Sequence, residues 1–305
     1  MVNSVEVFAI CVCTHQRPKM LTRCLLSLAK LKRYDSWRFV FIIVDNELAP
    51  NNHPTIEKLQ STFCSVIKYV HQPKRGIAAA RNAALDVALE EAADWVCFFD
   101  DDQYADKYAV IAAYQVALDM AADMVSMQVH YFFQNKLTLK RQKTELGFAG
   151  AGGVLFSAFL ISADGLGLRY DEAIGLGTGE DLKFRALAVS LGIRIAYAKK
   201  ALVYEEIVEQ RTKFWPKIYR GYCATVDCHK YNIPNKEVDL KLYWKIARKL
   251  LGIAELPLLV FYFFISTTFF NSRKFKIVYR FFQGCGIIAG LLNANPKYYK
   301  KTQGY

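Results

Sequence analysis

The sequence predicts an α/β domain built on a mostly parallel β-sheet that is covered by helices. Over about the first 205 residues, short apolar runs alternate with longer amphipathic or alanine-rich segments. Each connecting segment is long enough for a crossover helix, which parallel neighbouring strands require. Three successive carboxylates, Asp100 to Asp102, follow the apolar run Val96–Phe99. Open α/β sheets bind their ligands at the carboxyl ends of the strands, so this position predicts a functional site.

The individual elements follow from apolar periodicity and from residues that begin or end helices. Pro18 fits a first helical turn, because that turn needs no N–H donor from it, and Gly192 fits the position just after a helix. The predicted strands are Val5–Thr14, Arg38–Val44, Val66–Val70, Val96–Phe99, Met124–Val129, Ile193–Tyr197 and Leu202–Tyr204. The predicted helices are Pro18–Leu31, Thr55–Thr62, Gly76–Ala93, Lys107–Met120 and Glu180–Leu191. The glycine-rich stretch Gly147–Gly179 is predicted to form loops.

The basic residues are unevenly distributed along the chain. The net charge is +12, and from residue 211 onward 17 Lys and Arg stand against four Asp and Glu, out of 40 and 28 in the whole chain. The basic surplus therefore lies in the last third, which predicts an acidic partner there, either anionic lipid or nucleic acid. The aromatic residues of this part lie in apolar runs rather than on an alternating stacking platform. We therefore expect an anionic membrane surface as partner and no nucleic acid.

The change of composition predicts two domains, residues 1–210 and a basic, aromatic-rich helical region, residues 211–305. The second contains an apolar stretch, Leu250–Phe270, which Glu255 and Pro257 interrupt and which basic residues flank on both sides. A spanning helix needs about 20 predominantly apolar residues and usually has its positive excess on one side. We therefore expect an in-plane or re-entrant membrane element, and the alternative is a buried helical pair packed on the first domain.

The eight cysteines predict a reducing compartment. They are scattered, form no Cys-x-x-Cys pair and fit no zinc-finger spacing, so we expect small buried apolar residues. The first residues show no basic segment ahead of a signal-type apolar stretch, and Val5–Cys13 is better explained as a first strand. A cytoplasmic location is therefore expected.

The acidic triplet is a candidate metal site. Side chains two positions apart on an extended chain point the same way, so Asp100 and Asp102 are predicted to share a face while Asp101 points elsewhere. Adjacent anions repel one another unless a cation lies among them. Carboxylate oxygens suit Mg²⁺ or Mn²⁺, which often join a carboxylate to a substrate phosphate. The alternative is a solvated acidic turn that binds nothing.

Polar groups at other strand ends indicate a nucleotide-diphosphate ligand. Asp45 ends the second strand, where a carboxylate can accept hydrogen bonds from a base or a ribose hydroxyl. Thr14–Arg17 end the first strand, and Lys74–Asn82 bring positive charge to a helix N-terminus, a natural anion site. Each feature alone is weak, because a lone Asp at a strand end is often a turn former. Their order on successive strand ends is much more specific.

Five short motifs therefore follow one another along the chain. They are Cys13-Thr-His-Gln-Arg-Pro18, Ile43-Val-Asp-Asn46, Arg75-Gly-Ile-Ala-Ala-Ala-Arg-Asn82, Phe98-Phe-Asp-Asp-Asp102 and Gly179-Glu-Asp-Leu182. This ordered set resembles the family-2 glycosyltransferases over about residues 5–205. The resemblance implies the Rossmann-like GT-A fold, here followed by a helical, membrane-associating region. It also implies an inverting transfer from a nucleotide-diphosphate sugar to a glycan or lipid-linked acceptor, with Mn²⁺ or Mg²⁺ as cofactor.

The resemblance also assigns roles to residues. It implies that Asp45 contacts the nucleotide base and that Asp102 and Asp100 bind the metal as parts of a DxD element. It makes Asp181 the catalytic base and Glu180 the second choice. An acceptor hydroxyl needs such a carboxylate within hydrogen-bond reach, although both residues could instead stabilise the dipole of a helix. The nucleotide-sugar-binding set is Thr14, His15, Arg17, Asp45, Arg75, Arg81, Asp100, Asp101, Gly152 and Gly153.

Two details favour a single-sugar transferase over a polymer synthase. The processive members carry Gln-x-x-Arg-Trp after these motifs, and Glu209–Trp215 lacks that spacing. The tail Phe282–Gly290 loosely resembles non-processive relatives of bacterial exopolysaccharide and lipopolysaccharide assembly. We expect such an enzyme at the cytoplasmic face of the inner membrane, as a peripheral or monotopic protein, because basic and aromatic residues favour that interface.

Two other functions are weighed against this one. A sugar nucleotidyltransferase has a similar fold, but it would normally carry a glycine-rich loop after the first strand, and Thr14–Lys19 contains no glycine. The other is a non-catalytic basic protein that binds membranes.

Overall fold

The computed structural model describes residues 5–50, 52–63, 65, 67–133, 136–140, 152–207, 213–231 and 272–296. The chain divides into two compact units. The first contains the described residues up to Gly175 together with Glu180–Ile207. The second contains Leu176–Gly179 and the described residues beyond 207. The sequence-based boundary at residue 210 stays a prediction.

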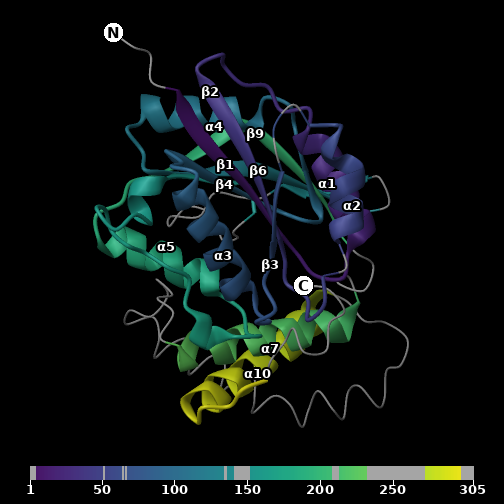
Figure 1. Ribbon diagram of the computed structural model, residues 1–305. Helices are drawn as coiled ribbons and strands as arrows, with labels where there is room; N and C mark the ends of the chain where they lie inside the picture. Colours follow the sequence, from purple (N-terminus) through teal and green to yellow (C-terminus); the bar gives the residue numbers. More distant parts are fainter. Residues whose placement is uncertain are drawn as a thin grey trace. The chain divides into compact units, whose positions relative to one another are not determined.

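The first unit is built on one nine-stranded sheet (Figure 1). Its strands are β1 (Glu6–Thr14), β2 (Trp37–Asp45), β3 (Ile67–His71), β4 (Trp95–Asp100), β5 (Gln103–Ala105), β6 (Met124–Phe133), β7 (Lys136–Lys140), β8 (Val154–Ser157) and β9 (Ile195–Glu206). Their order is β3-β2-β1-β4-β8-β6-β9-β5, and β7 pairs with β6. Strands β3, β2, β1 and β4 are mutually parallel, whereas β8 is antiparallel to both of its neighbours. The predicted parallel sheet is therefore confirmed for its first half and becomes mixed beyond β4.

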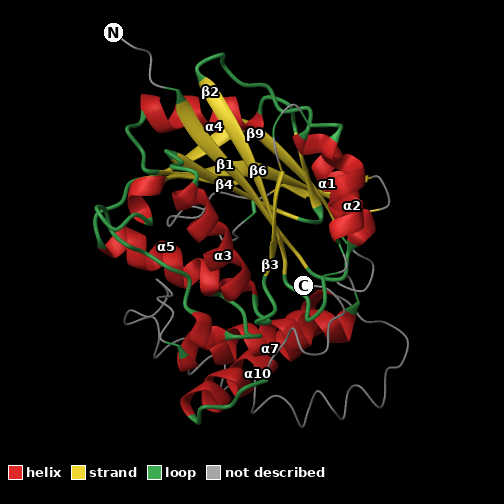
Figure 2. Cartoon of the chain, viewed as in Figure 1, coloured by secondary structure: helices red, strands yellow, loops and turns green. Residues whose placement is uncertain are grey.

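Helices cover both faces of this sheet (Figure 2). They are α1 (Pro18–Leu28), α2 (His53–Gln60), α3 (Ile77–Glu90), α4 (Ala109–Asp119) and α5 (Glu180–Ser190), and the turns η1 (Ala158–Leu160) and η2 (Glu172–Ile174) are short 3₁₀ helices. Alternate residues of β1 face opposite sides, as the period of a strand requires. Phe8 and Ile10 pack with α1, α2 and α4, while Ala9 and Cys11 pack with α3 and α5. Helices thus fix the strands from both sides, and the polar strand ends remain for a site.

Several elements differ from the sequence-based prediction. Strand β8 lies in the glycine-rich stretch that was expected to be loop, yet Val154, Leu155 and Phe156 are buried in the core. The two short strands expected near residues 193–204 form one strand, β9, whose pairing with β6 shifts in register between Met127 and Gln128. Lys199 and Lys200, which interrupt the apolar pattern of β9, lie at this irregularity. Strands β5 and β7 have no separate sequence signal because they are short and only partly apolar.

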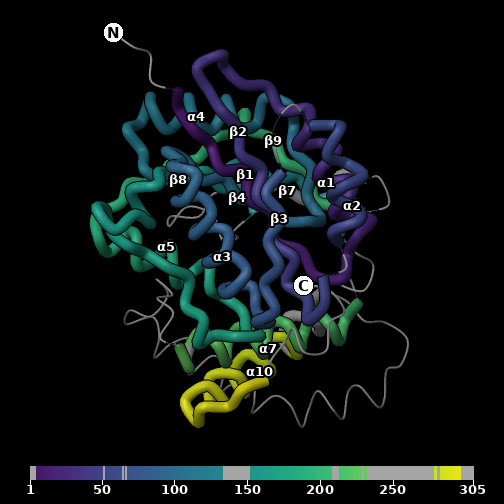
Figure 3. Tube along the Cα trace, viewed as in Figure 1, coloured from purple at the N-terminus to yellow at the C-terminus, as the bar shows by residue number. Residues whose placement is uncertain are grey.

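The second unit contains a pair of packed helices, α7 (Phe214–Lys230) and α10 (Ser272–Leu291), which the trace in Figure 3 follows in green and yellow. Gly221 permits their close approach, because a Cβ atom there would lie 2.4 Å from the ring of Tyr279. Among the described helices, none combines the length and apolar character that crossing a bilayer requires. The apolar stretch Leu250–Phe270 lies outside the described residues, so its membrane role stays a prediction.

Candidate active site

The polar strand ends meet at one edge of the sheet. Thr14 of β1 is in register with Asp45 of β2, and Cys13 of β1 is in register with Asp100 of β4. Strand order reverses at β1, because β2 and β3 continue to one side of it and β4 lies on the other. A reversal of this kind opens a crevice at the carboxyl ends of parallel strands. The predicted convergence of the strand-end residues therefore follows from the observed topology.

Arg17 is the centre of one charged cluster at this edge. Its Nη1 donates to Asp101 Oδ1 at 3.0 Å and to Asp102 Oδ2 at 3.3 Å, and all three side chains are largely buried. The Thr14 hydroxyl donates to the other oxygen of Asp101 at 2.8 Å. Burial raises the pKa of Asp101 to about 7, although the Arg17 guanidinium opposes this shift. One cation therefore compensates two neighbouring carboxylates and fixes their orientation.

Asp100 lies apart from this cluster. Its side chain is 40% exposed, and its Oδ1 lies 3.5 Å from Nη2 of Arg81. The expectation that Asp100 and Asp102 share a face rested on an extended chain, but β4 ends at Asp100 and the next two residues form a turn. It is Asp101 and Asp102 that share a partner, because the turn cancels the alternation of side chains.

Gly152 closes one side of the site around Asp100. A Cβ atom at this position would lie 2.4 Å from Asp100 Oδ2 and 2.5 Å from Gln103 Oε1, so a larger residue would displace these two side-chain ends. Gly153 has a φ of +68° and donates its N–H to the Phe98 carbonyl at 2.8 Å. A residue with a side chain is strained at such a φ. The glycine pair therefore brings backbone to the end of β4, and the predicted part of Gly152 and Gly153 in sugar binding stays a prediction.

The carboxylates fit a hard divalent cation. Mg²⁺ is usually held by one or two carboxylates and completes its coordination with substrate phosphates and water. Asp100 and Asp102 supply such oxygens at the end of β4. No group of three or more His, Cys, Asp or Glu side chains with metal-binding geometry occurs in the described ranges. The donor set therefore suits a cation that arrives with a phosphorylated substrate better than a closed structural site.

Asp45, at the end of β2, is the centre of a separate group of buried polar contacts. It is fully buried, and its Oδ2 accepts hydrogen bonds from the Tyr69 hydroxyl at 2.9 Å and from the Asn52 backbone N–H at 3.0 Å. Burial and this carboxylate raise the pKa of Tyr69 well above its usual range. Sequence reasoning found Asp45 but missed Tyr69 and Asn52. The available signal for Tyr69 was its position near the end of β3, the strand next to β2.

His15 and Asn46 connect the ends of β1 and β2 to the loop that precedes α3. His15 Nδ1 lies 2.9 Å from the Asn46 carbonyl oxygen, to which it donates, so its Nε2 can accept from Arg75 Nη2 at 3.3 Å. Burial lowers the pKa of His15, which favours the neutral ring that this arrangement needs. The Asn46 side chain donates to the carbonyls of Gln72 and Lys74, at 2.7 Å each, and accepts the Gly76 N–H at 2.9 Å. These contacts place Arg75 beside His15.

Arg81 is the centre of a second charged cluster. Its buried guanidinium forms ion pairs with Glu180 at the start of α5 and with Asp100 at the end of β4. It also lies over the Tyr170 ring, 5.4 Å from the centroid. Burial acts to lower the pKa of Arg81, but the carboxylates, Glu180 foremost, outweigh it and raise the pKa. The structure pairs Arg81 with Asp100 and Glu180, and its assignment to nucleotide binding stays a prediction.

The two candidate base residues therefore differ in environment. Glu180 is buried and paired with Arg81, and burial raises its pKa to about 7 against the opposing effect of that guanidinium. Asp181 is only half-buried, and its Oδ1 accepts the Leu182 backbone N–H at 2.9 Å. Because Glu180 is tied to the cluster that contains Asp100, the first turn of α5 lies at the same edge as the acidic strand end.

This combination of a reversed parallel sheet, acidic strand ends and a buried Asp beside them is typical of the GT-A fold. The sequence model "Glycosyl transferase family 2" matches residues 9–172, more than half of the chain. The chain belongs to glycosyl transferase family 2 and is a glycosyltransferase. The family and the enzyme class predicted from the sequence are confirmed, and membership decides against a nucleotidyltransferase and against a non-catalytic membrane protein.

Similar proteins agree with this assignment. The chain is 26% identical over 261 residues to the succinoglycan biosynthesis protein ExoM of Rhizobium meliloti (strain 1021), covering 81% of this chain and 82% of that protein. It resembles the structure of S. aureus TarS 1-349 in complex with UDP, with a TM-score of 0.53 and 18% identity over 72% of this chain and 64%, under two thirds, of that one. It also resembles the mannosyltransferase PcManGT of Pyrobaculum calidifontis in complex with GDP-Man and Mn²⁺, with a TM-score of 0.64 and 13% identity over 94% and 87% of the chains. The structural likenesses confirm the GT-A fold.

Proposed function

We propose that the protein moves one sugar from a nucleotide-diphosphate sugar to a hydroxyl of a glycan or lipid-linked acceptor, in a metal-dependent, inverting reaction. The observation that carries this proposal is the Arg81 cluster, which brings the acidic end of β4 and the first turn of α5 together. A diphosphate leaving group and a general base are needed on opposite sides of one sugar carbon. The cluster places Asp100 close to Glu180, whose neighbour in the chain is the proposed base Asp181.

The donor nucleotide fits the half of this edge formed by β1, β2 and β3. Asp45 would accept hydrogen bonds from the base or ribose, in a pocket that Tyr69 helps to form. Arg75 and His15 would donate to the diphosphate from the loop before α3, whose helix N-terminus favours an anion. Arg17 keeps the nearby carboxylates from repelling that diphosphate, because it balances part of their charge. The nucleotide bound by TarS is UDP and that bound by PcManGT is GDP-Man, which supports a nucleotide-sugar donor here.

Asp100 and Asp102 would hold the Mn²⁺ or Mg²⁺ ion. When bound, such an ion neutralises the negative charge that develops on the departing diphosphate. Arg81 Nη2 lies 3.5 Å from Asp100 Oδ1 and orients that carboxylate. Gly152 leaves room for the ligand by presenting only backbone to Asp100.

Asp181 is the residue we propose as general base. Glu180 is buried and faces Arg81 in an ion pair, so its carboxylate is turned away from an incoming acceptor hydroxyl. Asp181 is half-buried and lies next in the chain, so its second oxygen can face an incoming hydroxyl. A base that deprotonates the hydroxyl as it attacks directly gives inversion at the sugar carbon.

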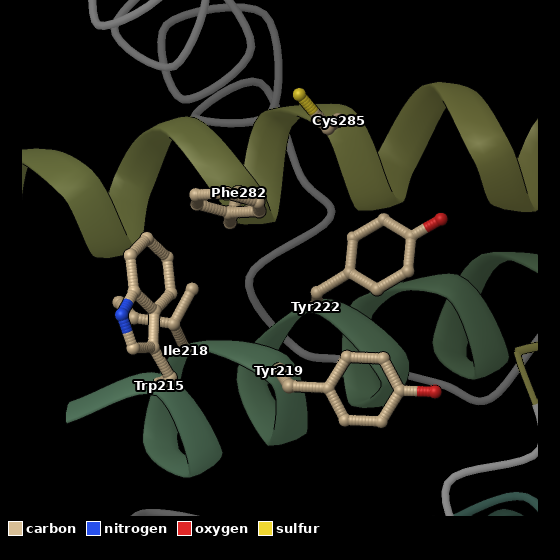
Figure 4. Close-up of a pocket in the computed structure, with 6 residues that line it drawn as sticks. All are labelled: Trp215, Ile218, Tyr219, Tyr222, Phe282 and Cys285. Carbon is tan, nitrogen blue, oxygen red and sulfur yellow. The ribbon is translucent and has the colours of Figure 1, made fainter. Parts of the chain in front are cut away.

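A hollow in the second unit supports a lipid-linked acceptor. Its volume is about 420 Å³, and Figure 4 shows the residues that line it, which are Trp215, Ile218, Tyr219, Tyr222, Phe282 and Cys285. The rings of Trp215 and Phe282 meet edge to face with centroids 6.2 Å apart. Such an apolar, aromatic hollow suits an acyl or isoprenoid chain, and the exposed Lys217 and Arg220 on α7 suit its phosphate.

The same features support a place at the cytoplasmic face of the inner membrane, with the protein peripheral or monotopic. The basic surplus beyond residue 210 would attract anionic headgroups. The relationship to ExoM favours a substrate from exopolysaccharide biosynthesis. Salt-dependent pelleting with anionic liposomes, but not with neutral ones, would support this location.

The function is tested by turnover of UDP- and GDP-sugars with Mn²⁺ or Mg²⁺, followed by mass spectrometry of the released nucleotide. Asp102→Ala should lower transfer by roughly 10²- to 10³-fold and weaken the metal dependence of nucleotide binding. Asp181→Asn should lower transfer by roughly 10²-fold and leave donor binding intact, because it removes only the base. NMR of the product should show an inverted anomeric centre.

Asp119→Asn serves as the matched control, because this aspartate is exposed at the end of α4. It should keep the activity of the unchanged protein. A protein that binds no nucleotide sugar with either metal would overturn the proposal.

A further inference from the structure

A buried carboxylate on α7 makes two contacts that the reaction described so far does not use. Asp227 is 1% exposed, and its Oδ2 accepts hydrogen bonds from the Thr178 backbone N–H at 2.8 Å and from the Thr178 hydroxyl at 3.1 Å. Both residues belong to the second compact unit, of which the short segment Leu176–Gly179 is a part. A helix side chain therefore holds both donors of one loop residue.

The loop residue that Asp227 holds has a particular place in the chain. Thr178 is followed by Gly179 and then by Glu180 and Asp181, which open α5. Gly179 has a φ of +91°, a conformation that residues with side chains rarely adopt. The start of α5 therefore follows a fixed residue and a sharp backbone turn, and Asp181 lies three residues along the chain from Thr178.

The stability of the fold alone does not explain why an aspartate is buried at position 227. Its other oxygen, Oδ1, is buried and has no hydrogen-bond partner among the described residues. Burial raises the pKa of Asp227, although the two Thr178 donors oppose this. A buried carboxylate with one oxygen unsatisfied usually destabilises a fold, and such groups in native proteins are often explained by function.

We infer that Asp227 is a positioning residue for sugar transfer, which fixes Thr178 and thereby the first turn of α5 with the candidate base Asp181. The inference rests on the proposed function. Donor binding residues lie at the ends of β1 to β4, none of which is held by Asp227. Loss of the contact should therefore slow the transfer step and leave the donor affinity unchanged.

The experiment measures kcat of transfer, the dissociation constant of the nucleotide donor and the thermal unfolding midpoint. Asp227→Ala removes the acceptor of both hydrogen bonds and should lower kcat by roughly 10- to 100-fold, because a displacement of about 1 Å at a reacting group costs on the order of 10². Asp227→Asn keeps an acceptor oxygen without the charge and should lower kcat by only about three- to ten-fold. The donor dissociation constant should change by less than about two-fold in both variants.

Changes at Thr178 test the same contact from its other side. Thr178→Val keeps the backbone donor and loses the hydroxyl, so its kcat should fall to the level of Asp227→Asn. Thr178→Ser keeps both the backbone N–H and a hydroxyl donor, so its kcat should equal that of the unchanged protein. Thr225→Val is the control on α7. The Thr225 hydroxyl donates to the Gly221 carbonyl of the same helix at 2.8 Å, so this change leaves the contact between Asp227 and Thr178 in place. It should keep full kcat.

The outcomes separate the inference from the function on which it rests. Full kcat in Asp227→Ala, with the unchanged protein active, would overturn the inference alone. A fall in kcat that is matched by a fall in the unfolding midpoint across Asp227→Asn and Thr178→Val would show a structural role and also overturn it. No transfer by the unchanged protein would overturn the proposed function itself.

Discussion

The two charged clusters at the sheet edge each have one buried arginine between two carboxylates, but they are assembled differently. Arg17 holds Asp101 and Asp102, which are neighbours in a single turn. Arg81 holds Asp100 and Glu180, which belong to a strand and a helix far apart in the sequence. The first cluster sets the charge of one turn. The second joins the acidic end of β4 to the first turn of α5.

Arg81 should therefore be the more sensitive of the two positions. Arg81→Met leaves Glu180 buried without its cation, and breaking a buried pair in this way costs about 3–5 kcal/mol of unfolding free energy. Urea unfolding measures this loss. The double variant Arg81→Met/Glu180→Gln should recover much of it, because no uncompensated charge remains. A double variant as unstable as the single one would contradict the importance of the pair.

Arg17→Met should have a smaller effect, of about 1–3 kcal/mol. Asp101 keeps the hydrogen bond from the Thr14 hydroxyl, and Arg17 is itself less deeply buried than Arg81. The same urea unfolding experiment measures the loss of unfolding free energy, and Arg81→Met is measured beside it for comparison. Equal losses in the two variants would remove the distinction between the clusters.

A third test of the Arg81 cluster is the pH dependence of stability. Glu180 has a folded-state pKa of about 7, above the usual value of 4.5. The folded protein therefore binds this proton more tightly than the unfolded chain. The stabilisation is fully present below pH about 4.5 and is lost as pH rises through about 7, at up to about 1.4 kcal/mol per pH unit.

The Glu180→Gln variant has no carboxyl group at this position, so its side chain does not take up or release a proton in this pH range. Its unfolding free energy should therefore rise relative to that of the unchanged protein between pH 4.5 and 7, when both are measured by urea unfolding in the same buffers. Curves that stay parallel through this range would count against a raised pKa for Glu180.

The residues at strand ends were the predictable part of the site. Asp45 and Asp100 follow apolar runs, and a parallel sheet brings such ends to one edge whatever the details of packing. The partners of these residues were not predictable in the same way. Tyr69 reaches Asp45 and Thr178 reaches Asp227 through tertiary contacts, for which local periodicity carries no signal.

The fold shows the same division. Strands β1 to β4 were predicted because each contains an apolar run that alternates with a predicted helix. Strand β8 was missed because glycines surround it, and its assignment depends on pairing with β4 and β6 rather than on its own four residues. Arg81 was assigned to the nucleotide because its charge is visible in the sequence, whereas its burial against Glu180 is not.

The reversal of direction between β4 and β8 has a consequence for how such an enzyme could diversify. An antiparallel neighbour enters the sheet where β4 leaves it, so Gly152 and Gly153 arrive at the catalytic edge from a connection independent of the four parallel strands. The length and composition of that connection can change without shifting the register in which the nucleotide half is built. On the proposed function, acceptor specificity can therefore change while the donor-binding residues on the parallel strands keep their positions.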